Sequence, residues 1–158
     1  MRMAKGKQSA ADALSAIERL LDAPCWVIDV LPSQVPADSG GQFFAAEHLL
    51  TKGAPRKFAR VLVKLGCYCE FVVARGEGHK PVRNPSPKKL RKWVAGDAYG
   101  LSVWLPGEDA LMVVPTQSTC MALHGPSARL LELVRAIAAS EGLFVWQSPD
   151  ESQAPANK

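Results

Sequence analysis

Three short apolar segments separated by tight turns constrain the fold of this chain more than any other feature. They span residues 99–105, 110–114 and 119–124, and each has the length of one β-strand. Pro106-Gly107-Glu108-Asp109 joins the first two, and residues 115–117 separate the second from the third; both are typical turn sequences. Connections this short join neighbouring strands that run in opposite directions, so the spacing predicts a three-stranded antiparallel meander.

The remaining pattern mixes helices and strands. Apolar residues recur at helical spacing between Gly125 and Gly142, and residues 143–147 follow as a last strand. The expected helices span about residues 9–24, 41–52, 55–65, 87–94 and 125–142, and the other expected strands span 25–31 and 67–75. Since strands and helices do not alternate regularly, the pattern predicts an α+β fold. We expect a mostly antiparallel sheet of about five to six strands, with helices packed on it as a two-layer sandwich.

The length of 158 residues fits one domain. We expect it to span residues 9–147, after a flexible lead at 1–8 and before a disordered, polar tail at 148–158. No stretch reaches the ~18 consecutive apolar residues of a membrane helix. The first residues also lack the apolar core of a signal peptide. The sequence therefore predicts a cytoplasmic protein with no membrane segment.

Four cysteines, Cys25, Cys67, Cys69 and Cys120, lie in apolar segments and are expected to be reduced, buried thiols. On a strand, Cys67 and Cys69 would point to the same side and both could contact a soft metal. Their spacing is not that of a zinc site, and no second cysteine or histidine pair follows. The sequence predicts neither a metal nor another cofactor.

Charge is concentrated in residues 51–93, which we call the basic segment. It contains twelve lysines and arginines but only Glu70 and Glu77, a balance of +10 in a chain whose net charge is +4. A basic region on an otherwise acidic chain favours an anionic partner. None of the common nucleic-acid-binding motifs occurs in it.

Two expected helices carry most of this charge on one face. The candidate anion-binding residues are Arg56, Lys57, Arg60 and Lys64 on the first helix and Lys88, Lys89, Arg91 and Lys92 on the second. Those of the first helix lie within one narrow arc, with no acidic residue of the same helix beside them. Two interpretations remain open. The residues either form a polyanion-binding face, or they solvate exposed helix faces or contact an acidic protein partner.

Catalytic alternatives depend on isolated residues. Asp29 lies in an apolar strand, where a carboxylate needs a hydrogen bond or takes up a proton; it either caps a neighbouring loop or joins His48 in a small active site. Ser39-Gly40-Gly41-Gln42 precedes an expected helix and would offer backbone N–H groups to an anion, although ordinary capping also explains it. Two tryptophans exposed on one sheet face would mark a partner surface.

These observations favour a small non-enzymatic binding protein that recognises a protein partner through its sheet or its basic face. The first alternative is a binder of nucleic acid or another polyanion that uses the two basic helices. The second is a small enzyme with a site around Asp29 and His48. No catalytic residue is assigned from the sequence.

Overall fold

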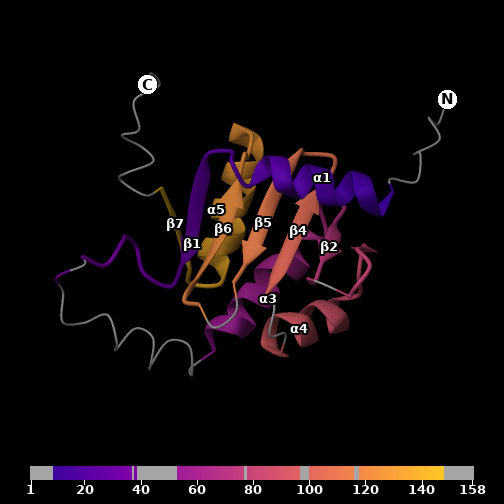
Figure 1. Cartoon of the computed structure of the whole chain (residues 1–158). Helices are drawn as coiled ribbons and strands as arrows, with labels where there is room; N and C mark the ends of the chain where they lie inside the picture. The colour runs from indigo at the N-terminus through magenta and orange to yellow at the C-terminus, as the bar shows by residue number, and fades with distance from the viewer. Residues whose placement is uncertain are drawn as a thin grey trace, which may run out of the picture.

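Figure 1 shows the computed structural model of the chain, in which helices pack against one open sheet. The structure describes residues 9–36, 38, 53–76, 78–96, 100–115 and 118–147. The expected helix at 41–52, the lead at 1–8 and the tail at 148–158 lie outside these residues.

Within the described residues the sheet has seven strands, and every neighbouring pair is antiparallel. Their order is β3-β2-β4-β5-β6-β1-β7. The strands are β1 (Cys25–Asp29), β2 (Val72–Ala74), β3 (Val82–Arg83), β4 (Leu101–Leu105), β5 (Ala110–Val114), β6 (Cys120–His124) and β7 (Phe144–Trp146). The predicted α+β fold with an antiparallel sheet is confirmed, with seven strands in place of five to six.

The central strands β4, β5 and β6 are neighbours in sequence order, so the predicted meander is confirmed. Asp109 takes a positive φ of 47° in the turn between β4 and β5, a conformation that Asp adopts more readily than most residues. Strands β6 and β7 both run antiparallel to β1, which lies between them, and therefore run parallel to each other. Helix α5 (Ala128–Ser140) makes the connection that this parallel relation requires.

Three helices cover one face of the sheet: α3 (Ala54–Leu65), α4 (Pro87–Gly96) and α5. They form the main core with the inward residues of the central strands, including Val103, Met112 and Leu123, which are fully buried. In α3, Phe58, Leu62 and Leu65 recur at helical spacing and are buried, while the charged residues lie on the outer arc. Sheet and helices thus form the expected two layers.

Helix α1 (Ala10–Leu20) lies across the opposite face of the sheet, at one end of the strands (Figure 1). Ser9 and Asp12 form a capping box at its start. Ile17 and Leu20 pack in a second, smaller core against Trp104 and Leu111. Of the helices that the structure describes, only α1 packs on this face, and it leaves part of the seven-stranded sheet uncovered.

The predicted strand at 67–75 is wrong in its first half. The N–H groups of Cys67, Tyr68 and Cys69 donate hydrogen bonds to the carbonyl oxygens of Lys64 and Leu65, which continues the end of α3 as a turn. Strand β2 begins only at Val72. Alternating cysteines and aromatic residues resemble a strand, but the unsatisfied carbonyl groups at the helix end capture the first three N–H groups. The segment between β2 and α4, for which no strand was expected, contains the short strand β3.

None of the described helices is long and apolar enough to cross a membrane.

Candidate functional site

The predicted cationic stripe of α3 is largely occupied by a contact with α5. Arg60 Nε lies 3.0 Å from Glu141 Oε2, and Lys64 Nζ lies 2.7 Å from Glu141 Oε1. Lys64 also donates a hydrogen bond to Ser140 Oγ at 2.8 Å. The Glu141 side chain is only 7% exposed, and the Lys64 ammonium group holds the pKa of this carboxyl below its ordinary value.

The same contact explains the position of Lys57. A Cβ atom placed on Gly142 would lie 3.6 Å from Lys57 Nζ, so this side chain also reaches the end of α5. Cations are favourable there because the last carbonyl groups of a helix carry partial negative charge. Of the four stripe residues, Arg56 remains exposed and without an ion pair in the described part of the chain. The acidic partner of the stripe was missed because Glu141 lies 77 residues beyond Lys64.

The four basic residues of α4 are arranged differently. Lys88, Lys89, Arg91 and Lys92 are all exposed, and none forms an ion pair with any residue that the structure describes. Leu90 and Trp93 face the core instead, and the Arg75 guanidinium group lies 4.5 Å from the centre of the Trp93 ring. The two basic helices look alike in sequence, but among the described residues an acidic side chain pairs with two cations of α3 and with none of α4.

Asp29 is buried, with 7% of its surface exposed, and its Oδ1 accepts a hydrogen bond from the Leu31 N–H at 3.1 Å. This turn bond two residues ahead is the loop cap that the sequence offers as one alternative for Asp29. Burial raises the pKa of the Asp29 carboxyl group, and the backbone hydrogen bonds partly offset that effect. His48 and the turn at 39–42 lie outside the described residues.

The cysteines are less buried than expected. Cys67 is exposed, while Cys25, Cys69 and Cys120 are partly buried, and no disulfide joins them. Cys67 and Cys69 lie in the turn after α3, so the expectation that they share one side of a strand is wrong. Burial raises the pKa of the Cys69 thiol. Among the described residues, no group of three histidine, cysteine or acidic side chains is placed to hold a metal ion.

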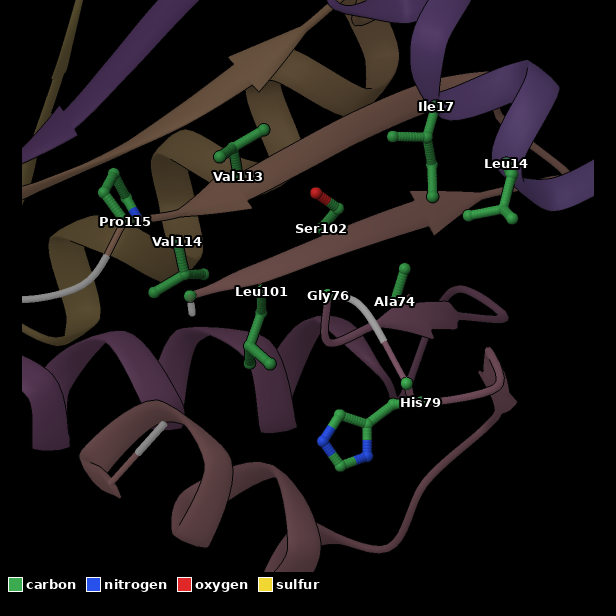
Figure 2. A pocket seen from close by; sticks show the side chains of 12 residues that line it. Leu14, Ile17, Ala74, Gly76, His79, Leu101, Ser102, Val113, Val114 and Pro115 are labelled. Atoms are coloured by element: carbon green, nitrogen blue, oxygen red, sulfur yellow. The ribbon is translucent and has the colours of Figure 1, made fainter. Parts of the chain in front are cut away.

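A cleft of about 510 Å³ lies beside α1, and we call it the α1 cleft. Figure 2 shows Leu14 and Ile17 extending from α1 toward the strands, and Ser102 and Val113 projecting from β4 and β5 on the same side. His79, from the segment after β2, completes the wall. Leu14 is 52% exposed, which leaves a large apolar side chain at the cleft mouth.

From one wall of the α1 cleft, a line of side chains extends across the sheet, and the strand register defines it. Side chains at paired positions point to the same face, so the pairing defines a line perpendicular to the strands. The line consists of Ala74, Ser102, Val113, Ala122, Val27 and Trp146, each the register partner of the next. All six are partly exposed, and five of them are apolar. We call this line the apolar row.

Residues beside the row complete this face. Phe144 lies on the same side of β7 as Trp146 and is 46% exposed. Trp146 Nε1 donates a hydrogen bond to the Leu31 carbonyl oxygen at 3.1 Å, which orients the ring at the sheet edge. Trp104 lies on this face too, but α1 covers it. The residues of the row were not predicted as a site, since each is an ordinary strand residue until the register aligns them.

Comparison of the chain with protein-family models, with curated proteins and with solved structures finds no match.

Proposed function

We propose that this chain is a non-enzymatic binding protein that recognises an extended apolar segment of a partner protein along the apolar row. The main support for this proposal is the apolar row itself. Six aligned side chains from six neighbouring strands form a path that begins in the α1 cleft at Ala74 and ends at Trp146. Scattered apolar residues are normal on a surface, but a continuous line of them is typical of an interaction site.

The dimensions of the row support a peptide-like occupant. Five steps between strands of about 4.8 Å each give a length of about 24 Å, which an extended chain of roughly seven residues covers. The α1 cleft, at about 510 Å³, accepts a large apolar side chain at one end. Trp146 and Phe144 provide aromatic contact area at the other end.

The polar groups in the α1 cleft support binding rather than catalysis. Ser102 and His79 both line it, but no hydrogen bond joins them, and Figure 2 shows the His79 ring turned away from the Ser102 hydroxyl group. A serine nucleophile needs a base within hydrogen-bonding distance. The described residues thus supply a shaped apolar surface without an activated nucleophile.

Selection of peptides from a random library against the immobilised chain tests the proposal. We expect apolar peptides whose Kd rises at least about tenfold when Ala122→Arg places a charge at the middle of the row, since burying an unpaired charge is costly. Leu14→Ser should also weaken binding, because Leu14 lines the α1 cleft. Leu21→Ser is the matched control: Leu21 is 48% exposed on the same side of the sheet but lies outside the cleft.

Circular dichroism of each variant confirms that the fold is retained. Peptides that bind Ala122→Arg and Leu14→Ser as tightly as the unmodified chain would refute the proposal. Selection of acidic peptides that lose binding with Lys89→Glu would refute it as well, because recognition would then reside on α4.

A further inference from the structure

We infer that the chain has a second binding surface, formed by the groove between α3 and α4 and the outer face of α4, and that this surface takes single-stranded nucleic acid. It lies on the side of the sheet opposite the apolar row and is independent of it. Three observations support the inference: a preformed groove, an exposed aromatic ring next in sequence to two residues that line it, and cations on a lining helix that form no ion pair with the described residues.

The α3–α4 groove has a volume of about 330 Å³, at the lower end of the range of about 300–1,000 Å³ for ligand pockets. Its floor is apolar, with Val63 of α3, Phe71 and Leu90 of α4. Cys67 and Cys69 form one rim, and residues 84–87 form the other. A flat, largely apolar group such as one nucleobase matches a groove with this lining.

Local hydrogen bonds hold the groove in shape without a ligand. Asn84 Oδ1 accepts from the Phe71 N–H at 2.8 Å, and the Asn84 N–H donates to the Phe71 carbonyl oxygen at 2.8 Å. Arg83 forms an ion pair with Glu70 at 2.9 Å beside them. Pro85 and Pro87 stiffen the same rim. A preformed groove binds with a smaller loss of conformational entropy.

Tyr68 lies between the two cysteines of the rim and is 69% exposed, more than any other large apolar or aromatic side chain that the structure describes. It does not line the groove itself, and most of its side chain is open to solvent. An aromatic ring in this position offers a face on which a neighbouring base can stack.

The cations of α4 lie on the outer face of a helix that also lines the groove. Residues 87 and 90 line it, and Lys88, Lys89, Arg91 and Lys92 project from the same helix over the exposed half of its circumference. Arg60 and Lys64 of α3 share an ion pair with Glu141, whereas no described acidic group pairs with these four. Cations without a described acidic partner attract a phosphate backbone, and an exposed aromatic ring offers its bases a surface on which to stack.

Single strands fit these features better than other polyanions. Bases in a duplex are stacked inside and cannot enter a groove or stack on Tyr68. Heparin and acidic peptides would use the lysines alone and would leave the groove and the aromatic ring without a function.

Fluorescence anisotropy with a labelled 15-nucleotide oligothymidylate tests the inference, with the duplex of the same length, heparin and polyglutamate as competitors. We expect binding that weakens as salt increases. In Lys89→Glu/Lys92→Glu the salt dependence should become shallower, by about 0.7 in the logarithmic slope for every phosphate that no longer has its cation. Tyr68→Ala should raise Kd roughly 5- to 150-fold, the range expected when one base can no longer stack, while Tyr68→Phe should leave it nearly unchanged.

Arg19→Glu/Lys80→Glu is the charge-matched control, since these two cations lie away from the groove, and it should bind the single strand with the same Kd apart from a small general charge effect. Absence of binding would overturn the inference. So would a Kd unaffected by Tyr68→Ala, or competition by duplex, heparin or polyglutamate as strong as that of the single strand, which would indicate a general polyanion or acidic-protein surface. Retention of peptide binding by Tyr68→Ala distinguishes this test from that of the proposed function.

Discussion

The Lys64 ammonium group of α3 lies 2.7 Å from the carboxylate of Glu141, immediately after the last residue of α5. Arg60 reaches the same carboxylate from one turn earlier. The contact ties the end of α5 to the middle of α3, although 77 residues separate the two partners along the chain. It converts a stripe that resembles an anion site into a structural ion-pair cluster.

Glu141→Gln should lower the free energy of unfolding by about 1 kcal/mol at pH 7, because it removes the charge that two partly exposed cations share. Urea denaturation measures this. Glu132→Gln, an exposed position of α5 with no ion pair among the described residues, serves as the control and should change stability by less than about 0.5 kcal/mol.

The effect of Glu141 should depend on pH. Its folded pKa lies below the ordinary value of 4.5, so its contribution is fully present above that value and is lost as pH falls through the folded pKa. The stability difference between the unmodified chain and Glu141→Gln should therefore shrink in acid. A difference that stayed constant from pH 7 to pH 3 would show that the ion pairs do not cause it.

Asp29 should behave in the opposite way. Burial raises its folded pKa above 3.8, so ionisation disfavours the folded state and its stability cost grows as pH rises through the folded pKa. Asp29→Asn keeps an acceptor for the Leu31 N–H without the charge and should be at least as stable as the unmodified chain at pH 7. Asp29→Ala leaves that N–H without its partner and should lose about 1–2 kcal/mol. Thermal and urea unfolding of the two variants test this, and a large loss in Asp29→Asn would mean that the carboxylate has a favourable charged partner.

Gly125 occupies a position that excludes a side chain. Its φ is +68°, and an added Cβ would lie 3.3 Å from both Ala23 Cβ and Leu20 Cδ2. Gly125→Ala should therefore lower stability by about 1–2 kcal/mol through backbone strain and close contact. Gly107→Ala is the control, because no atom lies within 4 Å of its added Cβ and its φ is not positive. Equal stability of the two variants would contradict this account of the junction between β6 and α5.

Cys67 should react with a thiol reagent such as Ellman's reagent before the other cysteines do. It is the exposed thiol, whereas Cys69 is partly buried and burial raises its pKa, which lowers the thiolate fraction. At pH 8 we expect one fast thiol per chain, lost in Cys67→Ser and kept in Cys69→Ser. A fast phase that survives Cys67→Ser would place the reactive thiol elsewhere.

Local structure was predictable wherever a signal and its consequence lie close together in the chain. The capping box of Ser9 and Asp12, the turn at 106–109 and the meander β4–β5–β6 all follow from neighbouring residues. The strand predicted at 67–75 failed because a helix end competes for the same N–H groups, and alternation of residue types cannot detect that competition. The positive charge of α3 could be predicted from the residues along that helix. Its acidic partner, just after α5, could not be predicted in this way.

The amino-acid sequence alone was sufficient to predict the fold class and most of the helices and strands. It also showed that positive charge is concentrated between residues 51 and 93. These features depend on residue periodicity and on contacts between residues a few positions apart, so they can be recognised in the sequence. Which cations remain unpaired, where the α1 cleft opens, and that Ser102, Val113, Ala122 and Trp146 form one line depend on contacts between distant segments. Packing and strand register create those contacts, because a shift of one residue in register would turn the apolar row to the other face of the sheet.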